Sequence, residues 1–476
     1  MPKSTIFPAP ELVWSGKHAP GFNNGVSAED ISCLEVHGNP PEGGNRLYLG
    51  DNLPILLHLR GEYGGSVDLI YIDPPFDSSA EYRKKVFLKT GTQPIRITES
   101  PQYSDIWSGC GYLQFIYERL LAAKLLLKPG GNMVLHCDWH RSHHLRCLMD
   151  EVFGPENFRN EIVYCYSGGG IPRSEMPKKH DVLLWYSNGA GWTYNAQYRS
   201  YSEGTLKRGR TAVKGEHARL REQGTPVNDW WTDIKKITSP TDPEKLYYPT
   251  QKSEELLERI ISMLSDPGGL VLDFFMGSGT APAAAAKLGR RFLGIDQNPA
   301  AVQTAVNRLA RMLGEAERCR ETFPGFEVFC AGGGEGRAQM GGCQPADGHL
   351  DAQIDAGELR ITAFCSPRLK AIMDAQQLRA EDWRQTAEAV FIDWDCDGEV
   401  FRPSAADIPA RRGLVSGVYP VPQGVGRIRI KAVDLLMGAQ TCELCVHGSE
   451  QRGPSFPDPM KIQAKKEGIE NEGTDD

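Results

Sequence analysis

Two segments of the chain carry the residue types of a nucleotide-binding site. An apolar run over 270–273 ends at Asp273 and leads into Gly277, Gly279 and an alanine-rich stretch. A glycine turn between a strand and a helix lets the backbone approach a ligand beside a helix N-terminus, which favours anionic groups. About twenty residues further on, Asp296 ends the next apolar run, where a carboxylate is suited to accept both ribose hydroxyls. The spacing favours a nucleoside cofactor over the alternative, an ordinary tight turn of an α/β fold.

The second chemical signal is the quartet Asp73-Pro74-Pro75-Phe76, which directly follows an apolar run. Adjacent prolines remove backbone donors, fix φ and leave carbonyl oxygens as unopposed acceptors. With a carboxylate and an aromatic face beside them, the quartet is suited to grip the two N–H donors of an exocyclic amino group while the ring stacks on Phe76. Taken alone, the quartet is equally a Pro-Pro turn after a strand.

The elements that position these residues alternate between strands and helices, which predicts an α/β fold. Apolar runs predict strands over 67–72, 132–136, 181–186, 270–273 and 291–296, and helical spacing predicts helices over 112–127, 143–153, 253–264, 280–288 and 299–313. Residues 187–245 lose this periodicity, as a long surface insertion does. We expect an N-terminal extension at 1–45 and a core at 46–330 that contains an insertion at about 165–245. A Gly-rich joint at 332–334 marks the start of a separate β-rich α+β domain at 331–453. A disordered tail is expected at 454–476.

Composition excludes several classes of protein. The 476 residues are 40% hydrophobic and 24% charged, which is typical of a globular chain. No apolar run approaches the ~20 residues of a membrane span, and no secretory signal is visible. The twelve cysteines lack a framework spacing, so we expect free thiols in the cytoplasm. The net charge is −8, yet residues 165–245 hold 13 basic and 9 acidic residues, which leaves a nucleic-acid partner open.

These segments together resemble the DNA amino-methyltransferases, which transfer a methyl group from S-adenosylmethionine to exocyclic nitrogens of bases. Asp73 to Phe76 resembles their catalytic motif, and Asp273 to Thr280 resembles their cofactor loop. Tyr48 to Asn52 is similar to the segment that approaches the cofactor's adenine, and Pro249 to Lys252 to the motif near its methionine carboxylate. The catalytic motif precedes the cofactor loop by about 200 residues, the order of the circularly permuted β class. The resemblance covers residues 46 to about 312.

The resemblance implies a Rossmann-like methyltransferase core with a basic recognition insertion and a small β-rich C-terminal domain. It implies catalytic roles for Asp73, Pro74, Pro75 and Phe76, and cofactor contacts for Asp51, Asn52, Thr250, Lys252, Asp273, Phe275, Gly277, Ser278, Gly279, Thr280 and Asp296. For double-stranded DNA, the expected contacts in the insertion are Lys178, Lys179, Lys207, Arg208, Arg210, Arg219 and Arg221. A solvated basic loop is the alternative for that insertion. No metal is expected.

Other interpretations remain open beside this one. Asp rather than Ser at position 73 favours adenine over cytosine as the methylated base, and the intact quartet argues against a non-catalytic DNA-binding relative. The runs Val390 to Asp395 and Gly398 to Phe401 resemble the trailing domain of type III modification subunits, which implies a restriction endonuclease subunit as one partner and a second copy of the chain as another. The cluster Cys137, His140, His143, His144 and Cys147 is expected to lie on a strand end and a surface helix rather than to bind zinc.

Overall fold

A computed structural model describes most of the chain. The described residues are 11–21, 27, 30–90, 95–168, 170, 172–211, 219–237, 239, 242–332, 340, 348–410 and 413–446. The predicted disordered tail at 454–476 and most of the Gly-rich joint lie outside these residues. None of the described helices is long and apolar enough to cross a membrane.

Within the described part, the main sheet has ten strands in the order β1-β14-β2-β13-β12-β3-β6-β8-β7-β11. Its centre is parallel and comprises β2 (Arg46–Leu49), β13 (Arg291–Asp296), β12 (Leu270–Asp273), β3 (Val67–Ile72) and β6 (Leu127–Cys137). β8 (His180–Ser187) runs antiparallel between β6 and β7 (Phe158–Cys165). This order is that of a Rossmann-like core, as predicted. The chain crosses from one half of the sheet to the other between β12 and β3, which makes that junction a topological switch point.

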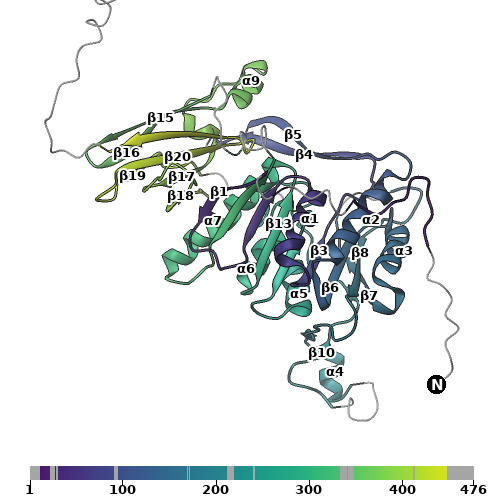
Figure 1. Cartoon of the computed structure of the whole chain (residues 1–476). Coiled ribbons are helices and arrows are strands. Elements are labelled where there is room, and N and C mark those ends of the chain that lie inside the picture. Colours follow the sequence, from purple (N-terminus) through teal and green to yellow (C-terminus); the bar gives the residue numbers. More distant parts are fainter. Residues whose placement is uncertain are drawn as a thin grey trace, which may run out of the picture.

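Helices cover both faces of the sheet (Figure 1). One face buries α5 (Glu254–Leu264), α6 (Thr280–Lys287) and α7 (Pro299–Cys319), and the other buries α1 (Asn52–Tyr63), α2 (Gly111–Lys124) and α3 (Ser142–Phe153). The alanines of α6 are almost all buried, and their small side chains allow this helix to pack closely between α5, α7 and the sheet. The strands and helices predicted for the core are thus confirmed, with ends that differ by a few residues.

Five strands of the main sheet were not predicted: β1, β2, β7, β11 (Trp230–Trp231) and β14. β1 (Ile31–His37) lies within the expected N-terminal extension and pairs antiparallel with β14 (Phe326–Ala331) at the edge of the sheet. Farther towards the N-terminus, the Trp14 indole donates a hydrogen bond to Gln114 of α2 (3.1 Å). Much of the described N-terminal part is therefore packed against the core.

The C-terminal region is β-rich, as predicted. One sheet contains β15 (His349–Asp355), β16 (Glu358–Cys365) and β19 (Val418–Pro420); another contains β18 (Ala405–Asp407), β17 (Ala387–Asp393), β20 (Arg427–Asp434) and β21 (Ala439–Cys445). Helix α9 (Pro367–Ala375) and a 3₁₀ turn, η4 (Trp383–Thr386), complete it. The region has a hydrophobic cluster of its own, which includes Leu359 and Ile430. Phe391 and Val433 pack instead in the same cluster as Val302 of α7, so the region also contributes to the core that surrounds the main sheet.

A long hairpin joins the core to the C-terminal region. It is formed by β4 (Ala80–Leu88) and β5 (Ile95–Asp105), which pair antiparallel and lie in the chain between the Asp73–Phe76 quartet and α2. Figure 1 shows it extending from the core towards α9. The periodicity of the sequence did not predict this hairpin.

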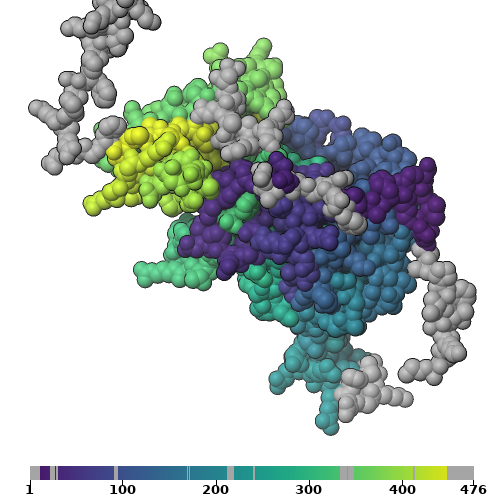
Figure 2. Space-filling view, viewed as in Figure 1, coloured from purple at the N-terminus to yellow at the C-terminus, as the bar shows by residue number. Residues whose placement is uncertain are grey.

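The predicted insertion at 165–245 is not a single irregular loop. It contains β8, a strand buried inside the main sheet, and β11 (Trp230–Trp231), which pairs with β7. Between these strands lie β9 (Tyr198–Arg199), α4 (Glu203–Arg208) and β10 (Thr225–Pro226). This part forms the teal projection at the bottom of Figures 1 and 2, away from β4 and β5.

Candidate functional site

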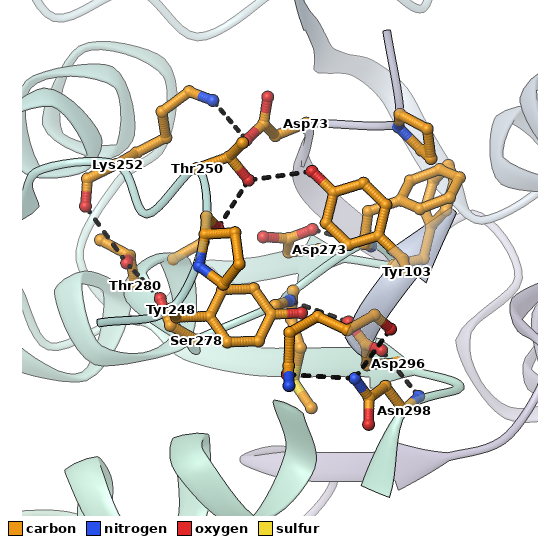
Figure 3. A pocket seen from close by; sticks show the side chains of 18 of the residues that line it. Asp73, Tyr103, Tyr248, Thr250, Lys252, Asp273, Ser278, Thr280, Asp296 and Asn298 are labelled. Atoms are coloured by element: carbon orange, nitrogen blue, oxygen red, sulfur yellow. Dashed lines mark hydrogen bonds and ion pairs between the residues drawn. The ribbon is translucent and has the colours of Figure 1, made fainter. Parts of the chain in front are cut away.

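The carboxyl ends of β3, β12 and β13 meet around a cavity of about 320 Å³. Because neighbouring parallel strands end at the same edge of a sheet, the side chains that follow them converge, here at the switch point of the sheet. Asp73, Asp273 and Asp296 line the cavity, and residues 248–252 form another wall (Figure 3). The two signals of the sequence, about 200 residues apart, are thus brought to one site.

The quartet Asp73-Pro74-Pro75-Phe76 begins where β3 ends. The Asp73 Oδ2 atom accepts a hydrogen bond from the Lys252 ammonium at 2.5 Å, whereas its Oδ1 atom is buried and has no partner among the described residues. Asp73 and Pro75 line the cavity. The half-buried Phe76 ring lies 5.1 Å from Lys252 Nζ. The carboxylate therefore keeps one free acceptor atom for a ligand N–H group.

The loop between β12 and α6, which is predicted to contact the cofactor, depends on two glycines with left-handed backbone. Gly277 has φ of 50° and Gly279 has φ of 73°. A Cβ atom at Gly279 would lie 2.6 Å from the Ala305 Cβ atom, and one at Gly277 would lie 3.1 Å from the Tyr248 ring. Larger residues would therefore strain the backbone and fill the space in which the loop folds. The helix α6 begins directly after this turn.

Two carboxylates beside the loop are electrostatically unusual. Burial raises the pKa of Asp273 well above its usual range, and the nearby Asp73 and Asp296 carboxylates act in the same direction. Burial also raises the pKa of Asp296 to about 6, although its oxygens accept hydrogen bonds from the backbone N–H groups of Gly277 (3.0 Å) and Asn298 (2.8 Å). Desolvated carboxylates in one cavity favour a ligand that carries positive charge.

Residues 249–252 form the wall beside this loop. Thr250 has φ of 58°, a left-handed conformation that turns the chain into the cavity, and its hydroxyl is 3.1 Å from the Tyr103 hydroxyl. Thr280 accepts a hydrogen bond from Arg308 (3.0 Å) and so is held at the start of α6. Ser278 and Phe275, which were also expected to contact a cofactor, line the same cavity.

Asp51 and Asn52 have different surroundings. Asn52 lines the cavity, donates to the Phe274 carbonyl (2.7 Å) and accepts from Arg119 Nε (2.5 Å). Asp51 caps α1 by accepting from Leu53 N (2.9 Å) and pairs with Arg119 Nη2 (2.9 Å), but it is not among the residues that line the cavity. Its contact with a cofactor stays a prediction.

Sequence reasoning missed a further set of cavity residues: Tyr71, Gln102, Tyr103, Ser104, Trp107, Phe115, Arg119, Tyr248 and Asn298. Several of them belong to the β4–β5 hairpin or to the segment that follows it. Tyr71 lies in the strand predicted over 67–72, and Phe115 and Arg119 lie in the helix predicted over 112–127, but no motif marked them as site residues. The residues at 102–107 reach the site through the hairpin, which the sequence did not predict. Among the described residues, no three metal-ligating side chains lie together.

The basic residues predicted to bind DNA fall into two groups. Lys178 and Lys179 directly precede β8. The first residue of β8 pairs with the last residue of β7, so both lysines lie near the edge of the sheet where Asp73 is found. Lys207 and Arg208 end α4, and Arg210, Arg219 and Arg221 follow it in the projection at the opposite edge (Figure 1). The structure does not bring the two groups together.

Comparisons with known proteins agree with this geometry. The family described as DNA methylase matches residues 67–307, about half of the chain, and the chain belongs to this family. It is 24% identical to the type II methyltransferase M.EcaI of Enterobacter cloacae, over 56% of this chain and 69% of that protein. It is 26% identical to the DNA adenine methyltransferase YhdJ of Escherichia coli K12, over 55% of this chain and 81% of that protein.

Two further likenesses complete the comparison. The chain is 24% identical to the Mod subunit of the type III restriction-modification enzyme StyLTI of Salmonella typhimurium, over 50% of this chain, and it spans about half of that protein's length (49%). The solved M1.HpyAVI–SAM complex matches with 22% identity and a TM-score of 0.36, over 56% of this chain and 98% of that one.

Proposed function

We propose that this chain transfers a methyl group from S-adenosylmethionine to the exocyclic amino nitrogen of adenine in double-stranded DNA. The observation that carries the proposal is the buried, unpartnered Oδ1 atom of Asp73 in a cavity that also contains the cofactor loop. A carboxylate with a free acceptor at this place is suited to an amino group. Family membership supports DNA as the substrate.

The residues present fit the proposed cofactor. S-adenosylmethionine would supply a methyl group on a positively charged sulfur, and the Asp73, Asp273 and Asp296 carboxylates form a cavity in which a cation is favoured. Asp296, which lines this cavity, would accept the ribose hydroxyls, and Gly277, which also lines it, would let the backbone of the loop approach the cofactor. The 320 Å³ cavity is within the range of ligand pockets.

The chain's own contribution is mainly alignment. Asp73 Oδ1 and the Pro74 carbonyl would accept the two amino N–H groups of a base turned out of the duplex, and Phe76 would stack on its ring. Lys252 holds Asp73 Oδ2 and so keeps Oδ1 directed to the base. Accepting both N–H bonds makes the nitrogen lone pair more available for the methyl group. Burial in the cavity strengthens these hydrogen bonds.

Adenine is favoured over cytosine by two observations. The quartet begins with Asp rather than Ser, and one relative is named as a DNA adenine methyltransferase. Methylation of the cytosine amino group is the alternative, since the same acceptors suit either base.

DNA contacts and protein partners belong to the same proposal. Lys178 and Lys179 would contact phosphates beside the catalytic edge, and the basic residues around α4 would extend the contact along the β7–β11 edge. The Mod-subunit relative supports a restriction endonuclease subunit as a partner, which affinity purification from the native host with mass spectrometry would test. A second copy of the chain is the other expected partner, which light scattering of the purified protein would test.

The experiment that tests the function uses the purified protein, unmethylated genomic DNA and tritium-labelled S-adenosylmethionine. We expect label to enter the DNA and nucleoside digestion to release methyladenine. A product that contains only methylcytosine would support the alternative, and unlabelled DNA with a protein that binds the cofactor would contradict methyl transfer.

A further inference from the structure

A buried carboxylate outside the predicted site holds the segment that follows the catalytic quartet. Asp105, the last residue of β5, is fully buried. It accepts hydrogen bonds from the backbone N–H groups of Phe76 (3.1 Å), Asp77 (2.8 Å) and Ser78 (2.8 Å), from Ser78 Oγ (2.6 Å) and from Trp107 Nε1 (3.2 Å). One side chain thus receives three consecutive backbone donors of the loop that contains Phe76.

The backbone that Asp105 holds is strained. Asp77 and Ser79 both have φ of 57°, a left-handed conformation that costs non-glycine residues free energy. Such a conformation persists only when its surroundings determine it strongly. Charge-assisted hydrogen bonds to a buried carboxylate are stronger than neutral ones, so Asp105 provides this constraint. Without it, the turn after Phe76 would relax.

The strand that ends at Asp105 also reaches the cofactor side of the cavity. Asn298 Nδ2 donates to the Gln102 carbonyl (3.0 Å), and the Tyr103 hydroxyl is 3.1 Å from Thr250 Oγ1. Asp105 therefore lies where the catalytic loop and the cofactor wall meet, although it is not among the residues lining the cavity.

We propose that Asp105 is a positioning residue for methyl transfer: it fixes the Pro75-Phe76-Asp77-Ser78 turn so that the quartet presents its acceptors and the Phe76 ring in the reactive geometry. The inference rests on the proposed function. A residue that served only folding would affect the stability of the whole protein. Asp105 is instead expected to affect the conformation of one turn and the rate of the chemical step.

The test is the Asp105→Asn variant, which keeps the shape of the side chain but places an amide N–H₂ group against backbone donors. A displacement of about 1 Å at a reacting group lowers rates by about 100-fold, so we expect kcat to fall between about tenfold and 100-fold. The KM for S-adenosylmethionine should stay within about twofold, since the contacts of Thr250 and Asn298 remain. Amide hydrogen exchange at residues 76–78 should become faster.

The matched control is Asp68→Asn, at the other end of β3. Asp68 also accepts a backbone hydrogen bond, from Leu270 N (2.7 Å), but it contacts no residue of the quartet. We expect its kcat and its exchange at 76–78 to match the wild type. The proposal would be overturned if amide hydrogen exchange at residues 76–78 were unchanged in Asp105→Asn. It would also be overturned if this exchange became faster while kcat stayed at the wild-type value. A wild-type protein without methyl transfer would instead contradict the proposed function, while the exchange data would still test the turn.

A different observation concerns the far end of the same hairpin. Val86, Leu88 and Ile97 of the hairpin form one buried cluster with Leu369, Met373, Leu435 and Leu436 of the C-terminal region. The Lys89 ammonium pairs with Glu388 (3.2 Å), and Gln376 of the region beside α9 donates to the Ile97 carbonyl. One end of the hairpin is therefore anchored on the C-terminal region, and the other end forms part of the cofactor cavity.

The geometry points to a role for the C-terminal region in cofactor binding: by anchoring the hairpin, it holds Gln102 and Tyr103 against the cavity. We expect Leu369→Ala, which removes part of the anchoring cluster, to raise the Kd for S-adenosylmethionine about fivefold or more, the size of a modest coupling between sites. This inference also rests on the proposed cofactor.

The control is Leu359→Ala, an equally buried leucine of the C-terminal region whose described cluster includes no hairpin residue. Both variants should lower the melting temperature, but only Leu369→Ala should weaken cofactor binding and speed hydrogen exchange in residues 101–104. Equal Kd values for the two variants would overturn the inference. If the wild-type protein binds no S-adenosylmethionine, the cofactor assignment fails instead, and exchange at 101–104 alone decides whether the anchor holds the hairpin.

Discussion

The Asp296 carboxylate is predicted to lower the stability of the ligand-free protein while serving cofactor binding. It is partly buried at the end of β13, and burial raises its pKa from 3.8 to about 6. Asp296→Asn removes the charge, but it also places an amide N–H₂ group against one of the backbone N–H groups, of Gly277 or Asn298, that the carboxylate accepts. We expect this variant to lose the pH dependence of stability that Asp296 provides and to bind the cofactor more weakly.

The sign and size of the stability change follow from proton binding. Between about pH 4 and pH 6 the folded protein binds more protons at Asp296 than the unfolded chain, so its contribution to stability falls as the pH rises. A pKa shift of about two units corresponds to about 3 kcal/mol at most, and water in the cavity screens part of it. We therefore expect the free energy of unfolding of Asp296→Asn, relative to that of the wild type, to rise by about 1–2 kcal/mol between about pH 4 and pH 8. The lost backbone hydrogen bond lowers the stability of the variant by about 1–3 kcal/mol at every pH.

Urea denaturation of both proteins across the range from about pH 4 to pH 8 measures this change. The stability difference between the two proteins should shift in favour of the variant as the pH rises from about 4 to above 6. Calorimetry with S-adenosylmethionine should show affinity reduced by roughly tenfold to 100-fold, because hydrogen bonds to a charged acceptor are lost. A stability difference that does not change with pH, or a variant that binds the cofactor normally, would refute the reasoning.

Two further predictions concern the loop and the DNA surface. Gly279→Ala should destabilise the protein by about 2–4 kcal/mol in urea denaturation, since its Cβ would lie 2.6 Å from Ala305 Cβ in a left-handed backbone conformation; wild-type stability would contradict this packing. Joint replacement of Lys178 and Lys179 by Ala should reduce the salt dependence of duplex binding by up to about 0.9 per lost phosphate contact. A second variant replaces three basic residues of the projection by Ala: Lys207, Arg208 and Arg210. Its salt dependence of duplex binding should also be reduced. An unchanged salt dependence would indicate that the duplex contacts only the edge of the sheet where Asp73 lies.

The sequence predicted those parts of the fold and site that depend on local pattern. The runs that end at Asp73, Asp273 and Asp296 are strands, and the glycines at 277 and 279 form the expected turn, because each of these features lies within a few residues of chain. Their convergence followed from the parallel order of the strands.

The remaining features depend on contacts between distant segments. Asp105 caps a turn 27–29 residues away in the chain, and Lys252 reaches Asp73 across 179 residues. Neither pairing has a local signature. All seven basic residues were predicted to contact DNA from one insertion, because the amino-acid composition does not show where residues lie in space. In the structure, Lys178 and Lys179 precede β8 at one edge of the sheet, and the basic residues around α4 follow β8 at the other edge.

The most direct test of the account compares the methylated nucleosides made by the wild type and by Asp73→Ala. Each purified protein is incubated with S-adenosylmethionine and unmethylated DNA, and the digested DNA is measured by mass spectrometry. The account predicts methyladenine from the wild type and none from Asp73→Ala, although the variant still binds the cofactor in calorimetry. Methylation at the wild-type rate by Asp73→Ala would contradict the assignment of this carboxylate to the transfer site.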